Sequence, residues 1–119
     1  MSDRTREEIL RDLVSLAGPV APLEDELRGF DWDSNERLSV VTAADARSVL
    51  DRFIRGEVTA AECAAWAEAL EMRDDVGFEP SFEAILKDLV FAGLSHPVIN
   101  GQLTLDSARL WKSRLAVRR

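Results

Sequence analysis

Three residue types that often carry chemistry are scarce here: the chain has one cysteine, one histidine and no tyrosine. The single cysteine, Cys63, cannot form an internal disulfide, and we expect it to be a small buried residue in an alanine-rich helix. One Cys and one His do not supply the usual ligand set of a zinc site, and no glycine-rich phosphate loop is present. We therefore expect a protein that is not an enzyme and has no metal or cofactor.

Long apolar runs are missing as well, since no stretch approaches the roughly 18 residues that suggest a membrane span. The first residues are charged and lead into no apolar signal-peptide core, which indicates a cytoplasmic protein. A length of 119 residues with 46% hydrophobic content suits one core. We expect a single domain over residues 1–119, with 118–119 frayed.

Negative charge is abundant and unevenly placed. Residues 22–36 carry a net charge of −5 and residues 57–79 carry −6, whereas the rest of the chain is net positive within a total of −7. Charge gathered in this way can steer a basic partner into a defined encounter and would repel a nucleic acid. The pattern favours a basic protein as the partner.

Helix signals recur from end to end. Capping boxes are predicted at Thr5-x-x-Glu8, Thr42-x-x-Asp45 and Thr59-x-x-Glu62, and caps at Ser81 and Thr104. Apolar residues follow each cap at helical spacing, and the stretch from 82 to 94 is apolar around more than half its circumference, so we expect it to be the central helix. A short helical turn is expected over 22–28 and a loop over 74–80, because Gly77 and Pro80 resist helix. Residues 38–41 are the one candidate strand and are too short to build a sheet. These signals predict an all-α, single-domain, compact bundle of four to five helices.

The loop after residue 29 contains a fragment of a calcium-binding pattern. Asp31, Asp33 and Asn35 place oxygen ligands at alternating positions, as a calcium loop does at its start. The sixth position is Glu36 where a sharp turn requires Gly, and the twelfth is Thr42 where a bidentate Glu should complete the shell. Two requirements of the loop are thus unmet, and we expect no calcium there.

Trp32 lies between two carboxylates in the same loop. In the simplest structural interpretation the two acids cap turns while the indole packs on the bundle. In the functional interpretation an aromatic ring flanked by acids forms a hot spot for an Arg- or Lys-rich partner. We expect partner binding through this segment and through the acids at the end of the 60–71 helix. The predicted binding residues are Asp31, Trp32, Asp33, Glu36, Glu68, Glu71, Asp74 and Asp75.

The C-terminal residues are basic. Arg109, Lys112, Arg114, Arg118 and Arg119 could form a patch on the last helix. Cations near a helix C-terminus are favoured by the helix dipole, so we expect a solvated face and no direct binding of nucleic acid.

Several phrases of the chain resemble known proteins. They are Phe30-Asp31-Trp32-Asp33, the stretch 50–62 with Phe53-Ile54-Arg55-Gly56-Glu57-Val58-Thr59-Ala60-Ala61-Glu62, the stretch 66–75, and Pro97-x-x-Asn100-Gly101-x-Leu103-Thr104. Together they resemble a group of small, mostly uncharacterised bacterial proteins, and residues 53–62 are similar to the early helical part of colicin-type immunity proteins. Those are small acidic helical inhibitors of secreted nucleases, so the resemblance implies an immunity-like role.

The leading hypothesis is therefore an acidic helical protein that binds and occludes a basic bacterial toxin of the nuclease type. The alternative is a subunit or adaptor that assembles with itself, including as a homodimer, or with another regulator. A small enzyme that uses carboxylate or metal chemistry, or a Cys63–His96 pair, is the third possibility.

Overall fold

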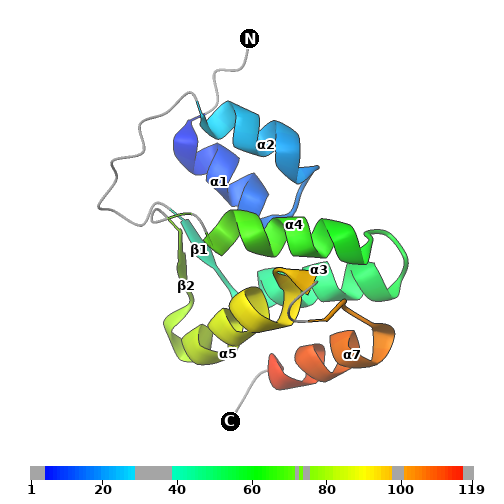
Figure 1. Ribbon diagram of the computed structural model, residues 1–119. Coiled ribbons are helices and arrows are strands. Elements are labelled where there is room, and N and C mark those ends of the chain that lie inside the picture. The colour runs from blue at the N-terminus through cyan, green and yellow to red at the C-terminus, as the bar shows by residue number, and fades with distance from the viewer. Residues whose placement is uncertain (1–4, 29–38, 72, 74–75, 98–100, 117–119) are drawn as a thin grey trace.

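The computed structural model describes residues 5–28, 39–71, 73, 76–97 and 101–116 (Figure 1). These residues form helices, two short strands and two non-α turns of helix. In chain order the elements are α1 (Arg6–Ser15), α2 (Val20–Leu27), β1 (Ser39–Val41), α3 (Ala43–Ile54), α4 (Ala60–Glu71), β2 (Val76–Phe78), the 3₁₀ turn η1 (Pro80–Phe82), α5 (Glu83–Asp88), the π-helical segment η2 (Leu89–Leu94) and α7 (Leu105–Arg114). The mostly helical single domain predicted from the sequence is confirmed. The described part contains six α-helices, because the expected turn over 22–28 is the short helix α2.

The helix starts follow the predicted caps. Thr5 and Thr42 form complete capping boxes with Glu8 and Asp45. At the start of α4, Thr59 and Glu62 exchange backbone-to-side-chain hydrogen bonds of 2.9 and 3.1 Å. Thr104 caps α7 in the same way, with Ser107 in the position of the acid. Each box satisfies two backbone N–H groups that have no partner inside the helix, which fixes where the helix begins.

Two expectations about the middle of the chain are wrong. The segment 38–41 does build a sheet, and the loop expected over 74–80 contains its partner strand. β1 and β2 pair in parallel, with Ser39 opposite Val76 and Val41 opposite Phe78. The ladder gains a further bond from the Glu79 N–H to the Val41 carbonyl at 2.9 Å. Helices α3 and α4 form the crossover that two parallel strands require.

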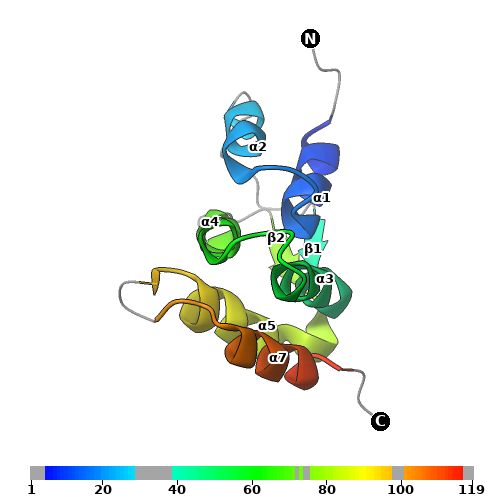
Figure 2. The same ribbon diagram turned by 90° about the vertical axis from the view of Figure 1, so that its right-hand side faces the viewer.

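The segment after residue 80 also differs from the expectation. Ser81 lies within η1 and does not cap the helix, which begins at Glu83 and changes to a π-helix at Leu89. It is not the central element either, because Phe91 is 42% exposed. The central position belongs to α4, which packs against α1, α2, α3 and η2. Figure 2 shows α4 end-on between α2 and α5.

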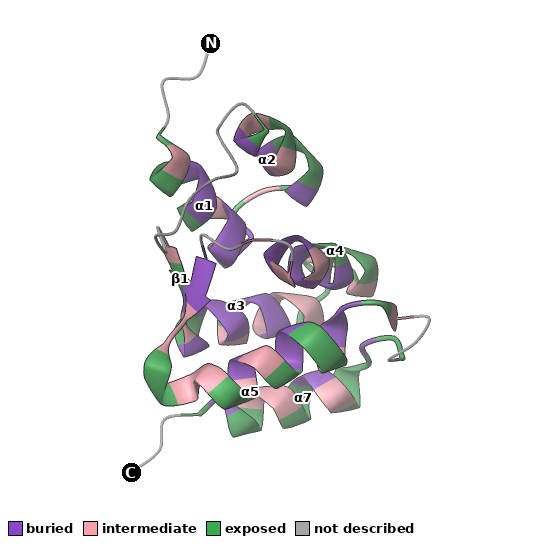
Figure 3. Ribbon diagram, turned by 60° about the vertical axis from the view of Figure 1, so that its left-hand side comes forward, coloured by how far each residue is buried: buried purple, intermediate pink, exposed green. Residues whose placement is uncertain are grey.

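The burial of α4 explains its sequence. Six of its twelve residues are buried, and they surround most of the helix (Figure 3). Trp66 is fully buried, and its indole N–H donates to the Val14 carbonyl at 3.3 Å. That bond ties the centre of α4 to α1 without leaving a buried donor unpaired. Within the ranges described above, none of the helices has both the length and the apolar character needed to cross a membrane.

Candidate functional site

The described ends of helices α2 and α4, which belong to the two acidic sequence segments, lie on one side of the fold. The first precedes β1, and the second runs through α4 into β2. Because the strands are parallel and in register, Ser39 and Val76, the first residues of the two strands, lie side by side. Figure 1 shows α2 and α4 running in the same direction and ending on the same side of the molecule as these strand starts. The C-terminal ends of α2 and α4, which are far apart in sequence, thus lie on the same side of the molecule.

Five described acids of these segments lie at the C-terminal ends of α2 and α4, whereas Glu62 lies in the first turn of α4. Glu24, Asp25 and Glu26 occupy the last turn of α2, and Glu68 and Glu71 the last turn of α4. Neither last turn contains a basic residue. A helix carries a partial negative charge at its C-terminus, so a carboxylate there costs a few tenths of a kcal/mol to about 1 kcal/mol where an Arg or Lys would stabilise. The placement of these acids therefore gives no benefit to helix stability.

Part of this charge is neutralised within the chain. Arg28, which follows α2, forms an ion pair with Asp25. Both side chains are more than half exposed, so the pair contributes little to stability. The charges of Glu24 and Glu26 are not neutralised by this pair. Glu26 makes another interaction within the fold.

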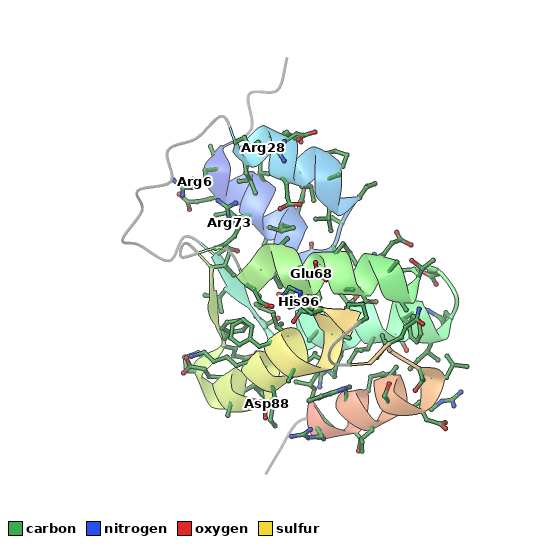
Figure 4. All side chains as sticks on the ribbon, in the orientation of Figure 1. Arg6, Arg28, Glu68, Arg73, Asp88 and His96 are labelled. Atoms are coloured by element: carbon green, nitrogen blue, oxygen red, sulfur yellow. The ribbon has the colours of Figure 1, made fainter. Side chains whose placement is uncertain are left out.

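The acids of α4 are joined to the end of η2 by His96. The backbone N–H of His96 donates to Oε2 of Glu68 at 3.1 Å, and its ring Nε2 lies 3.4 Å from Oε1 of Glu71. His96 has a φ of 49°, in the left-handed region that a histidine seldom adopts. Figure 4 shows Glu68 and His96 facing each other between α4 and the segment after η2. The Glu68 carboxylate thus helps hold a strained backbone turn against the central helix.

Glu71 is the less satisfied of the two carboxylates. Its side chain is 19% exposed, and its Oε1 is buried without a hydrogen bond, since the His96 ring is within ion-pair distance but not in hydrogen-bonding geometry. A carboxylate oxygen withdrawn from water attracts a cationic donor more strongly than an exposed one does. Such a donor can come from His96 or from a partner.

Of the binding residues predicted from the sequence, the structure places two. Glu68 and Glu71 lie one helical turn apart on α4 and are half-buried, not fully outward. The remaining predictions, Asp31, Trp32, Asp33, Glu36, Asp74 and Asp75, fall outside the described residues. So does most of the calcium-like fragment. The sequence did not indicate that His96 joins these glutamates, because the contact spans 28 residues and carries no local signal.

The described part of the chain has few groups suited to nucleophilic catalysis or metal binding. Cys63 is fully buried, and burial together with Glu62 raises the pKa of its thiol to about 11, which keeps it protonated and unreactive at neutral pH. Among the residues that the structure describes, no three His, Cys, Asp or Glu side chains are grouped so that they could hold a metal ion.

The basic residues of α7 largely interact within the molecule. Lys112 donates to Oδ1 of Asp51 on α3 at 2.8 Å, and this bond lowers the pKa of Asp51 below its ordinary value of 3.8. The Arg114 guanidinium lies 4.5 Å from the centre of the Trp111 ring. Near them, Ala44, Arg47, Ser48, Asp51 and Lys112 line an open hollow of about 370 Å³. Lys112 and Arg114 thus have partners within the chain.

No protein-family model, curated protein or solved structure matches this chain.

Proposed function

We propose that this protein is an acidic protein-binding module, an immunity- or antitoxin-like inhibitor that occludes a basic bacterial toxin of the nuclease type and acts in the cytoplasm. The observation that carries the proposal is the parallel pairing of Ser39 with Val76. With α2 and α4 ending on the same side of the molecule (Figure 1), it puts Glu24, Asp25 and Glu26 on the side that carries Glu68 and Glu71.

The mechanism is electrostatic attraction followed by occlusion. A nuclease binds a polyanion, so its active site is cationic, and a protein surface of grouped carboxylates can occupy that site as phosphates would. Charges at the rim raise the association rate, whereas tight binding requires a desolvated anchor at the centre. Trp32, which follows Asp31 and precedes Asp33 in the sequence, is the proposed anchor, and Asp31, Asp33, Glu36, Glu68, Glu71, Asp74 and Asp75 are the proposed charged contacts.

The position of the acids supports this assignment. Glu68 and Glu71 lie at the negative end of α4, and Glu71 has a buried oxygen without a hydrogen bond. A carboxylate is unfavourable at the negative end of a helix and a buried oxygen without a donor is costly, so a cationic partner would relieve both. Binding is therefore expected to gain energy from interactions that the free protein leaves incomplete.

The test has two steps. The tagged chain is used to capture proteins from its source cells at about 50 mM and about 500 mM salt, where interactions between charges are weakly and strongly screened, respectively. The captured proteins are identified by mass spectrometry. The proposal predicts one basic protein that is lost at high salt. Its nuclease activity should then fall in proportion to the added chain until one equivalent is present. A captured protein that is acidic, or whose activity the chain leaves unchanged, would contradict the proposal.

The site assignment is tested separately by alanine substitution. Replacing Trp32 by Ala is expected to weaken binding by at least about 30-fold, the effect of losing a hot-spot residue of about 2 kcal/mol. Single replacements of Asp31, Asp33, Asp74 and Asp75 should weaken it less and mainly slow association. Tight binding that survives all five replacements would overturn the site while leaving the partner identified.

The alternative is a homo-oligomeric or adaptor subunit without catalytic activity. It is favoured by the large apolar side chains left exposed on the surface, of which Leu110 is the most exposed at 61%. Concentration-dependent association in light scattering that changes little with salt would support it, because apolar interfaces are not screened.

A further inference from the structure

The outer face of α7 is unusual because a large apolar residue, Leu110, is exposed at its centre. The side chains of Ala108 and Leu115 are buried on the opposite side of the helix, where α7 packs against α3. Leu110 is 61% exposed, the largest value among the exposed apolar residues of the described chain. A leucine at this position stabilises neither the helix core nor its packing against α3.

The residues around Leu110 are arranged symmetrically. Asp106 and Arg114 lie four residues before and after it, and Ser107 and Ser113 lie three residues before and after. At about 100° per residue, all four fall within about 60° of Leu110 on the helix circumference. Asp106 is fully exposed and Arg114 is also exposed. The face therefore has an apolar centre, a negative end and a positive end.

We propose that this face binds the same face of a second copy of the chain, in an antiparallel two-fold contact centred on Leu110. A two-fold contact requires a self-complementary surface, in which each residue meets its counterpart across the axis. Antiparallel pairing about Leu110 places Leu110 against Leu110 of the second copy. It also brings Asp106 toward Arg114 of the second copy, twice.

Charge complementarity identifies the second copy as the occupant. The two residues that would meet carry opposite charges at equal distances from the centre, an arrangement that a surface for an unrelated partner has no reason to show. Arg109 lies about 100° from Leu110 and stays at the edge, within 3.8 Å of its own Asp106. Arg109 therefore lies beside the Asp106 carboxylate and away from the proposed two-fold axis.

The contact is small, and this sets the strength to expect. Stable interfaces bury about 1,200–2,000 Å² in total, and the pairing of one three-turn helix with its copy lies at or below the lower limit. We expect a reversible dimer with a dissociation constant in the micromolar range or weaker. α7 and α2 lie on opposite sides of the molecule (Figures 1 and 2). A dimer formed through α7 therefore leaves the acids of α2 accessible in both copies.

The proposal is independent of the proposed function and is tested on the purified chain alone. Sedimentation velocity over a protein concentration range from about 5 to about 500 µM, which spans the weak affinities expected of such an interface, should show a monomer–dimer equilibrium. Leu110→Asp should raise the dissociation constant at least tenfold. Leu105→Asp is the matched control, because Leu105 is 47% exposed on the same helix but faces about 140° away from Leu110.

A charge exchange provides the second test. Asp106→Arg and Arg114→Asp should each weaken the dimer, since each places like charges opposite one another. The double variant Asp106→Arg/Arg114→Asp should recover affinity to within about threefold of the parent chain, because the pair is restored in reverse. Circular dichroism at each step establishes that the variants are folded. A chain that stays monomeric at the highest concentration, a Leu105→Asp variant as impaired as Leu110→Asp, or a double variant without recovery would each overturn the proposal.

Discussion

Gly93 shows at the residue scale how closely η2 packs against α7. A Cβ built at this position would lie 2.8 Å from Cζ2 of the Trp111 indole, a distance that no stable contact allows. The indole is rigid and held between helices, so it would have to shift as a whole. The absence of a side chain at Gly93 is therefore what lets the Trp111 ring pack beneath η2.

We predict that Gly93→Ala lowers the free energy of unfolding by about 1–3 kcal/mol, the usual cost of overpacking. Gly18→Ala is the control, because a Cβ there meets nothing within 4 Å and the backbone has no positive φ. It should be neutral or slightly stabilising. Urea unfolding of the two variants beside the parent chain measures the difference, and an equal midpoint for both would contradict the described packing.

Arg52 stabilises the fold through the hydrogen bonds of its guanidinium at the end of α1. Its guanidinium donates to the Ser15 and Leu16 carbonyls at 2.8 and 2.9 Å, where α1 ends without intrahelical partners for those oxygens. Leu16 has a φ of 51°, a left-handed conformation that terminates the helix. One side chain from α3 thus satisfies two carbonyls at the end of α1.

Arg52→Met keeps the apolar part of the side chain and removes both bonds. We expect a loss of about 1–3 kcal/mol in unfolding free energy, because two partly buried acceptors lose their donors. Arg55→Met, which removes only exposed ion pairs to Asp51 and Glu57, should change stability by less than about 1 kcal/mol. Thermal unfolding of the two variants distinguishes a helix-terminating arginine from a surface one, and equal losses would argue against the assignment.

At the scale of elements, α3 and α7 are joined by a pH-dependent bond. The hydrogen bond from Lys112 lowers the pKa of Asp51 and is the largest effect. Desolvation, the next largest, raises the pKa, and the charges of Lys112 and Arg55 lower it further. A carboxylate whose folded pKa lies below its unfolded value stabilises the fold above that unfolded value, and the contribution disappears as pH falls through the folded pKa.

We therefore expect the parent chain to melt at a higher temperature than Asp51→Asn near neutral pH. The difference should shrink on acidification below about pH 4, where the unfolded carboxylate becomes protonated. Added salt should also reduce it, because the pair is partly exposed. Calorimetry at several pH values measures this difference, and a gap that stays constant from neutral to acidic pH would show that Asp51 acts by something other than its charge.

The elements also show what the sequence could and could not predict. The starts of α1, α3, α4 and α7 were correct because a capping box is local and needs only four residues. The pairing of β1 with β2 was missed because neither three-residue strand has a pattern of its own, and their contact depends on two intervening helices. The change to a π-helix at Leu89 was missed for a similar reason, since its buried face looks like that of an α-helix.

The same difference between local sequence signals and tertiary contacts applies to the candidate site. Glu68 and Glu71 were identifiable as acids at a helix end, whereas the contact of His96 with both required the fold. The placement of the last turns of α2 and α4 on the same side of the molecule likewise follows from the tertiary structure and not from any motif.

At the scale of the whole molecule, the acids of α2 lie away from the two exposed leucines of α7, Leu105 and Leu110. Figure 1 shows α2 and α7 on opposite sides of the molecule. A molecule of this kind can present one surface to a basic partner and another to a copy of itself. Binding and self-association are then expected to be independently removable by substitutions on opposite sides.

The central claim is that grouped carboxylates bind a basic partner, and one measurement tests most directly whether the acids on the side where α2 and α4 end take part. Capture from the source cells is compared, at low salt, between the parent chain and a variant neutralised at Glu24, Glu26, Glu68 and Glu71 by Gln substitution. The control neutralises four exposed or half-exposed acids elsewhere, at Glu57, Glu83, Asp88 and Asp106. We predict that a basic partner is retained by the parent and the control and lost from the first variant. Equal retention by both variants would contradict the claim.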